Sequence, residues 1–109
     1  MAHFAPGTRA LRTLTAAGKH LSFTRAADEV GLTPAAVSFQ IKEIEDQLGV
    51  KLFTRTSRTM RLTEAGTVLY EAAVDALDIM GRAVSKAQKA SRGTAQLKVS
   101  VSPHFATKW

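Results

Sequence analysis

Basic side chains gather in residues 51–62, a stretch that contains no acidic residue. They are Lys51, Arg55, Arg58 and Arg61. Guanidinium and ammonium groups bind phosphate through charge and hydrogen bonds, so this cluster favours a polyanion as partner. The net charge of +6 over 109 residues favours the same kind of partner. A solvated basic loop without a partner is the alternative for the cluster taken alone.

A second set of side chains lies on the outward face of a predicted helix over residues 34–48. Its inner stripe consists of Val37, Ile41, Ile44 and Leu48, which recur at helical spacing. At about 100° per residue, the opposite face of its first two turns carries Ala35, Ser38, Phe39 and Lys42. These side chains could contact base edges or phosphates. Glu43, Glu45 and Asp46 follow, and their charge would repel phosphate, so the first half of the helix is expected to face the polyanion.

Helix signals place two shorter helices before this one. The first covers residues 8–18 and closes near its terminal glycine. The second begins at Ser22, a good N-cap, and ends at Gly31, which adopts a left-handed conformation cheaply. Thr33 and the proline after it begin the helix with the outward face, and Gly49 ends it. Two helices joined by a tight turn are thus expected beside the basic cluster.

Residues 50–62 predict a two-stranded wing. Leu52 and Phe53 would anchor it, Thr56 to Thr59 would form its turn, and Met60 and Leu62 would return to the core. The basic cluster therefore lies on a wing that projects next to the outward helix face.

A long helix is predicted from Thr63 to about Ser91, with an apolar face too wide for one small domain to cover. Such a surface implies a partner, most simply a second copy of the chain. The candidate dimer contacts are Leu69, Ala73, Ala76, Leu77, Met80 and Val84. After the helix, Leu97, Val99 and Val101 alternate with polar residues, which predicts a C-terminal strand.

Several classes of function are disfavoured. The chain has no cysteine, which excludes disulfides and thiolate metal sites and indicates a reducing compartment. No apolar stretch is long enough for a membrane span, and no signal peptide is expected. His3, His20 and His104 lack a metal-ligand spacing, and no nucleophile or phosphate-loop motif occurs. We therefore expect neither an enzyme nor a metal or other cofactor.

The chain resembles the N-terminal DNA-binding domain of LysR-type transcriptional regulators, and most of all their glycine-cleavage-activator-like branch. The matching residues are Ser22-Phe23-Thr24-Arg25-Ala26-Ala27, Leu32-Thr33-Pro34-Ala35-Ala36-Val37-Ser38, Gln40-Ile41-Lys42 with Glu45, Leu48-Gly49-Val50, Leu52-Phe53 with Arg55, and Leu62-Thr63-Glu64-Ala65-Gly66. They occur in order between residue 9 and about residue 90, in several independent blocks. Chance agreement is therefore improbable.

The resemblance implies a mainly α fold: a winged helix-turn-helix over residues 1–62, a long linker helix over 63–92, and a stray strand. Two copies would pair antiparallel through the linker helix. Residues 93–109 would begin an effector-binding domain that is cut short. A small-molecule effector and a tetramer are expected only of a full-length protein.

The resemblance also implies residue roles on double-stranded DNA. The expected contacts are Ser22, Thr24, Thr33, Ala35, Ser38, Phe39, Gln40, Lys42, Arg55 and Arg58. Ser22 and Thr24 could instead only cap their helix, and Gln40 could satisfy backbone groups. One of the wing arginines could enter the minor groove. Phe39 departs from the arginine or histidine common in the family, so it would contact thymine methyl groups rather than guanine, unless it packs in a protein contact.

Two functions from different classes remain. The first is sequence-specific binding of an interrupted inverted repeat by a dimeric bacterial transcription regulator in the cytoplasm, associated with the nucleoid. The second is a winged-helix protein-interaction module that assembles through its long helix without specific DNA readout. The basic wing favours the first function.

Overall fold

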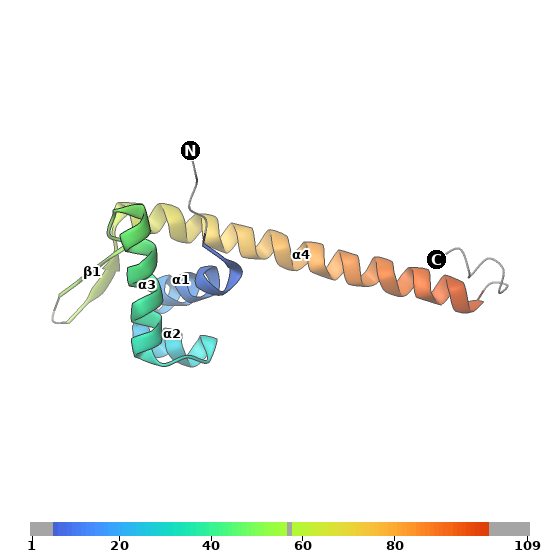
Figure 1. Ribbon diagram of the computed structural model, residues 1–109, viewed down its shortest axis with the longest axis horizontal. Helices are drawn as coiled ribbons and strands as arrows, with labels where there is room; N and C mark the ends of the chain where they lie inside the picture. The colour runs from blue at the N-terminus through green and yellow to red at the C-terminus, as the bar shows by residue number, and fades with distance from the viewer. Residues whose placement is uncertain (1–5, 57, 101–109) are drawn as a thin grey trace. The chain divides into compact units, whose positions relative to one another are not determined.

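The computed structural model describes residues 6–56 and 58–100, with side chains described as far as residue 92. Its elements are α1 (Thr8–His20), α2 (Phe23–Val30), α3 (Pro34–Leu48), β1 (Phe53–Arg55), β2 (Met60–Leu62) and α4 (Glu64–Ser100) (Figure 1). The chain divides into two compact units, Met1–Leu77 and Asp78–Trp109. The first unit contains α1, α2, α3, the two strands and the first turns of α4. The predicted mainly helical fold with a two-stranded wing and a long helix is confirmed.

Local capping contacts confirm the predicted ends of α2 and α3. Ser22 Oγ and Thr33 Oγ1 each accept a hydrogen bond from the amide three residues on, at 3.2 Å and 3.1 Å. Gly31 and Gly49 follow the two helices with φ angles of 74° and 73°. Glycine adopts this left-handed region without a steric cost. The turn between α2 and α3 is thus specified by residues within it.

The prediction that the first helix closes near Gly18 is wrong. α1 continues to His20, and Leu21 is its C-cap, with a φ of 50°. Gly18 is buried inside the helix, and a Cβ atom at this position would overlap the ring of Tyr70 in α4. The glycine therefore permits α1 and α4 to approach closely, a tertiary requirement that resembles a helix stop in the sequence.

The core of the first unit consists of small and branched apolar side chains from every helix and from the wing. It comprises Leu14, Ala16, Ala17, Ala26, Ala27, Val37, Ile41, Ile44, Leu52, Phe53 and Ala73. The predicted inner stripe of α3 is buried except for its last member, Leu48, which is 39% exposed because it lies at the end of the helix. Burial of this stripe fixes which face of α3 points outward.

The wing pairs β1 with β2 in antiparallel register, with Phe53 opposite Leu62 and Arg55 opposite Met60. Thr56 N donates to Thr59 O at 2.8 Å, and the two threonine hydroxyls lie 2.8 Å apart. The predicted wing is thus confirmed, with its turn closed by a pair of threonines.

Thr63 and Gly66 attach the start of α4 to the wing. Thr63 N donates to Leu52 O at 2.9 Å, Thr63 Oγ1 donates to Lys51 O at 2.6 Å, and the same oxygen accepts from Gly66 N at 2.9 Å. A Cβ atom at Gly66 would overlap the Leu52 carbonyl group. The predicted cap at Thr63 is confirmed, and it also ties the helix to the chain segment that enters β1.

The prediction of a strand that includes Leu97 and Val99 is wrong, because α4 continues through Ser100. Val101 lies outside the described residues. Within the described ranges, β1 and β2 pair only with each other, so residues 97–100 have no neighbouring strand. A helix satisfies its backbone hydrogen bonds within one segment, whereas a strand needs a partner, and this difference favours the helix.

Candidate nucleic-acid interface

The outward face of α3 is presented as the sequence predicts. Phe39 is 63% exposed, an unusual state for a large aromatic side chain. Ala35 and Lys42 are exposed beside it, and Ser38 is half-buried. The first half of α3 therefore offers an apolar ring, a hydroxyl and an ammonium group to a ligand.

Glu45 does not belong to the repelling acidic end, and its predicted outward position is wrong. The residue is 8% exposed, and its Oε2 atom accepts hydrogen bonds from Leu52 N at 2.8 Å and Phe53 N at 3.3 Å. Lys51 Nζ lies 3.9 Å from the other carboxylate oxygen. Glu45 thus links α3 to the start of the wing, since its charge is compensated by two amides and an ammonium group.

The second half of α3 keeps exposed carboxylates at Glu43 and Asp46. Asp46 Oδ1 lies 3.7 Å from Lys42 Nζ, an exposed pair one helical turn apart. Such pairs are weak and readily exchanged in solvent. Lys42 is therefore available to a phosphate at little cost.

A groove of about 470 Å³ lies between α3 and the wing. Its lining consists of Phe23, Ser38, Ile41, Lys42, Glu45, Lys51, Phe53, Thr54 and Arg55. Four polar residues line it from the two sides: Ser38 and Lys42 from α3, and Lys51 and Arg55 from the wing segment. The groove thus brings cations from both sides of the helix–wing junction to one place.

Arg55 is held in this groove by an aromatic contact. Its guanidinium carbon lies 4.6 Å from the ring centroid of Phe23, the first residue of α2. The Phe23 ring in turn meets the ring of Phe53 edge to face, with centroids 5.8 Å apart at 82°. These distances fall in the range of cation–π and T-shaped contacts. Arg55 is therefore anchored to the core through two rings.

The remaining predicted contacts are distributed around this centre. Thr24 and Thr33 are exposed at the starts of α2 and α3, and Ser22 uses its hydroxyl as a cap. Arg58 is exposed in the wing turn. Gln40 is half-buried, and among the described residues its Oε1 atom is buried without a hydrogen-bond partner. That oxygen therefore does not satisfy backbone groups, the alternative left open for Gln40.

Lys51, Thr54 and Phe23 are groove residues that the predicted contacts omit. Lys51 stands in the basic cluster, so its charge was a usable signal. Phe23 offered none, since an aromatic residue at the start of an amphipathic helix reads as a core residue. Its position beneath Arg55 depends on the packing of α2 against the wing.

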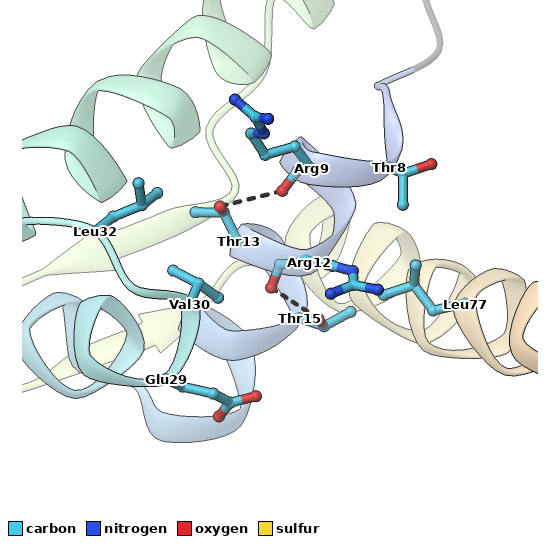
Figure 2. Close-up of a pocket in the computed structure, with 9 residues that line it drawn as sticks. All are labelled: Thr8, Arg9, Arg12, Thr13, Thr15, Glu29, Val30, Leu32 and Leu77. Carbon is cyan, nitrogen blue, oxygen red and sulfur yellow. Dashed lines mark hydrogen bonds between the residues drawn. The ribbon is translucent and has the colours of Figure 1, made fainter.

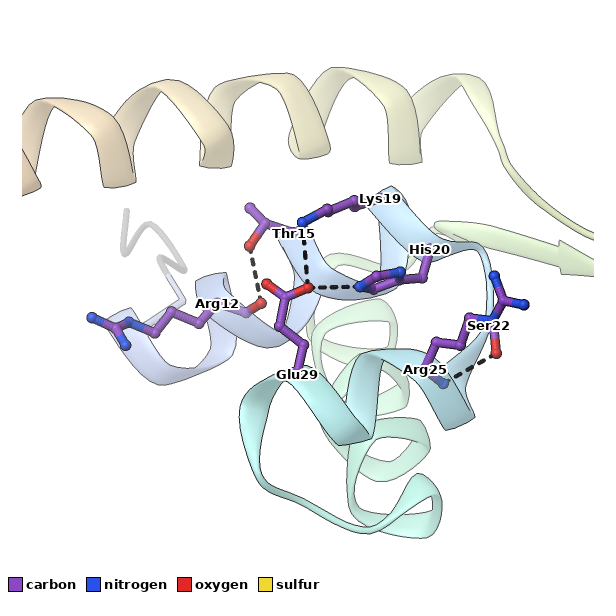
Figure 3. A network of polar contacts seen from close by, with 7 residues as sticks. All are labelled: Arg12, Thr15, Lys19, His20, Ser22, Arg25 and Glu29. Carbon is purple, nitrogen blue, oxygen red and sulfur yellow. Dashed lines mark hydrogen bonds and ion pairs between the residues drawn. The ribbon is translucent and has the colours of Figure 1, made fainter.

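A polar network joins α1 to α2 outside the groove (Figure 3). His20 Nε2 lies 2.6 Å from Glu29 Oε1, and Lys19 Nζ lies 3.6 Å from the same oxygen. The hydrogen bond with His20 lowers the pKa of the Glu29 carboxyl below its ordinary value of 4.5, and the charge of Lys19 acts in the same direction. The network thus fastens the two helices on the side where α2 ends.

A larger hollow of about 880 Å³ lies on α1 (Figure 2). Its lining is Thr8, Arg9, Arg12, Thr13, Thr15, Glu29, Val30, Leu32 and Leu77. None of the predicted DNA contacts is among these residues. Within the described ranges, no group of His, Cys, Asp and Glu could hold a metal ion, and no helix combines the length and hydropathy of a membrane span.

An outward helix face beside a basic wing is the arrangement of a winged helix-turn-helix protein. The chain belongs to the LysR family of bacterial regulators: the model described as "Bacterial regulatory helix-turn-helix protein, lysR family" matches residues 8–67. The resemblance seen in the sequence is thereby confirmed. The family is one of regulatory proteins, not enzymes.

Two curated relatives illustrate the similarity. The chain is 45% identical over 106 residues to the glycine cleavage system transcriptional activator of Escherichia coli K12. The aligned region covers 95% of this chain and 34% of that protein. It is 49% identical over 69 residues to the transcriptional activator AmpR of Pseudomonas aeruginosa PAO1. That aligned region covers 63% of this chain and 23% of that protein. The chain thus spans about a third or less of the length of these relatives.

Solved structures of similar domains contain DNA. The DNA-binding domain of BenM with its benA site 1 DNA superposes with a TM-score of 0.76 at 32% identity, over 81% of this chain and 99% of that chain. The DNA-binding domain of CbnR with DNA superposes with a TM-score of 0.72 at 27% identity, over 79% of this chain and 99% of that chain. The fold predicted from the sequence is therefore shared with DNA-binding domains of the family.

Proposed function

We propose that this chain is the DNA-binding part of a LysR-type transcriptional regulator that binds double-stranded promoter DNA as a dimer. The observation that carries the proposal is the outward face of α3, with Phe39 63% exposed, next to the basic groove. An α-helix fits the major groove of B-DNA, and its first turns then meet base edges. The adjacent cations would neutralise the phosphates that flank the groove.

The side chains divide into two kinds of contact. Ala35, Ser38 and Phe39 would meet bases, because they lie on the exposed first turns of α3. Phosphate contacts are assigned to hydroxyl, amide and cationic groups around them: Ser22, Thr24, Thr33, Gln40, Lys42, Lys51, Arg55 and Arg58. Phosphate contacts set affinity and position, whereas base contacts set sequence preference.

Phe39 gives the proposed readout its particular character. The ring has no hydrogen-bond donor, so it cannot recognise guanine as arginine does. It can pack against the C5-methyl group of thymine in the major groove. We therefore expect the preferred half-site to place a thymine methyl group opposite this side chain.

The proposed dimer uses apolar side chains on α4. Of the dimer contacts predicted from the sequence, Ala76, Met80 and Val84 are exposed. Ala73 is 2% exposed in the core of its own chain, so it has no surface to offer a second copy. Leu69 and Leu77 are partly buried, so they offer less surface. Val68 and Ile79 were not among the candidates, yet they are 66% and 59% exposed. Burial of these side chains by a second copy would remove apolar surface from water.

The roles of the whole protein belong to the same proposal. Because this chain spans about a third of its curated relatives, a small-molecule effector would bind to a segment that follows the linker helix. Residues 93–109 would lead into that segment, and the tetramer would depend on it. Bacterial promoter DNA lies in the cytoplasm, so the protein would act there at the nucleoid.

The test begins with selection of bound sequences from a random duplex pool. Affinities of the 109-residue chain are then measured for the selected and a scrambled duplex at 50 and 200 mM salt. We expect preference for the selected duplex and a steep loss of affinity with salt. Arg58→Ala should weaken both duplexes alike and reduce the salt slope by about one per chain. Phe39→Ala should instead reduce the preference for the selected duplex by roughly 5- to 150-fold, which corresponds to the about 1–3 kcal/mol that one base pair contributes to specificity.

Two results would contradict this scheme. Equal and very weak binding to both duplexes at either salt concentration would favour the protein-interaction module. A uniform loss in Phe39→Ala, equal on selected and scrambled DNA, would show that Phe39 does not read bases. Circular dichroism of each variant controls for the fold.

A further inference from the structure

Arg55 is the last residue of β1 and is exposed, yet its guanidinium group has a specific contact in the structure. It stacks on Phe23 at 4.6 Å, and Phe23 is fixed by the ring of Phe53, which is 7% exposed. Arginine side chains in solvent sample many rotamers, and their ordering on binding reduces affinity. The two-ring stack orders Arg55 before any ligand arrives.

The stack leaves the hydrogen-bonding capacity of Arg55 intact. Its N–H donors lie in the guanidinium plane, and a cation–π contact uses only the face of that plane. None of the ion pairs of the described residues includes Arg55. Lys42 and Lys51, by contrast, each lie within 4 Å of a carboxylate, at 3.7 Å and 3.9 Å. Arg55 is thus ordered by a ring and keeps its donors, whereas these lysines share their charge with an acid.

The contact with Phe23 holds Arg55 at the groove between α3 and the wing, where a phosphate could bind. Arg55 and Phe23 both line the groove between α3 and the wing, together with Ser38 and Lys42. A phosphate in this groove could accept hydrogen bonds from Arg55 on one side and from Ser38 or Lys42 on the other. Arginine binds phosphate oxygens with its rigid fork of donors, so its orientation decides how well it binds.

We propose that Phe23 is a positioning residue that holds Arg55 in the groove between α3 and the wing for a backbone phosphate of DNA. This inference rests on the proposed function, since it assigns a role in DNA binding. It gives Arg55 and Arg58 different tasks. Arg55 is the pre-ordered phosphate ligand, and Arg58 in the wing turn makes its contact independently of Phe23.

The test is a double-mutant cycle on the selected duplex. Phe23→Leu removes the ring but keeps an apolar side chain, and Phe23→Tyr keeps the ring. We expect Phe23→Leu to weaken binding roughly 2- to 10-fold per chain, from the ordering of one arginine side chain on binding. Phe23→Tyr should keep wild-type affinity. Phe23→Leu should have no further effect in Arg55→Ala, and its full effect in the matched control Arg58→Ala.

A second measurement reads the stack in the free protein. The δ protons of Arg55 should show upfield ring-current shifts in the wild-type chain and in Phe23→Tyr, and lose them in Phe23→Leu. This readout also decides the question if Phe23→Leu unfolds, because wild-type Arg55 shifts at random-coil values would overturn the proposal. Equal effects of Phe23→Leu in the Arg55→Ala and Arg58→Ala backgrounds would overturn it as well. If the wild-type chain itself prefers no DNA sequence, the proposed function fails instead.

Discussion

Gly31, Gly49 and Gly81 have open space around them but differ in their backbone conformation. A Cβ atom at Gly31, Gly49 or Gly81 would meet no other atom within 4 Å. Gly31 and Gly49 have φ angles above 70°, whereas Gly81 lies inside α4. The same added methyl group therefore tests backbone conformation without the complication of packing.

We expect Gly31→Ala to destabilise the fold by about 1–2 kcal/mol, because the left-handed conformation is strained for a residue with a Cβ atom. Gly81→Ala should instead stabilise α4 by up to about 1 kcal/mol through helix propensity. Urea unfolding measures the first change, and far-UV circular dichroism on heating measures the second. An equal loss in both variants would contradict this account. Loss of the dimer in Gly81→Ala would show that a partner helix approaches closely there.

At the scale of elements, side chains that are distant in sequence fasten one element to the next. Glu45 joins α3 to the wing through two backbone amides, and Thr63 joins the wing to α4. Glu29 joins α2 to α1 through His20 and Lys19. The angle between α3 and the wing therefore depends on a few polar groups as well as on the apolar core.

The Glu29 contact makes stability depend on pH. Because the pKa of the Glu29 carboxyl is lowered in the folded chain, its contribution is present above the ordinary value of 4.5 and is lost as pH falls through the lower folded value. We expect the melting temperature of Glu29→Gln to fall below that of wild type above about pH 5, with the difference shrinking toward pH 3. Thermal melts across this range measure the effect.

Exposed Glu43 on α3 provides the matched control, since no ion pair of the described residues includes it. The difference in melting temperature between Glu43→Gln and wild type should not shrink between about pH 5 and pH 3. If Glu29→Gln behaved in the same way, the contact would not contribute to folding.

At the scale of the whole molecule, several large apolar side chains of α4 are exposed. Val68, Ile79, Met80 and Val84 are between 47% and 66% exposed. Isolated exposed apolar residues are common, but their recurrence along one helix is typical of an interface. A second copy would cover them, and the dimer would then present two α3 helices to one DNA molecule.

We expect Ile79→Asp to convert the dimer to monomers, because a buried unpaired carboxylate costs several kcal/mol. Binding to the selected inverted repeat should fall by at least about 100-fold, since the two half-sites are then bound separately. Sedimentation velocity and DNA titration measure the two effects. Ser85→Asp adds the same charge at another exposed position of α4 and should leave both unchanged. A monomeric wild-type chain would contradict the proposed interface.

Features that depend on neighbours in the chain could be predicted before the fold was known. Ser22, Gly31, Thr33 and Gly49 set the ends of α2 and α3 through contacts within a few residues. The α3 stripe, with its period fixed by helix geometry, determined that Phe39 faces outward. The charge of residues 51–62 was visible from composition, and two of the cations that line the groove, Lys51 and Arg55, belong to this segment.

Features that need contact between two segments could not be predicted, because they depend on how the folded chain packs. Glu45 turned inward because the amides of Leu52 and Phe53 arrive beside it, and Gly18 proved to be a point of close approach to Tyr70 rather than a helix end. Residues 97–100 became helical because no strand among the described residues lies beside them. Arg55 was visible as a charge, but its place over Phe23 depends on the packing of the wing against α2. Spacing along a chain specifies local hydrogen bonds and faces, whereas partners in space are chosen by packing.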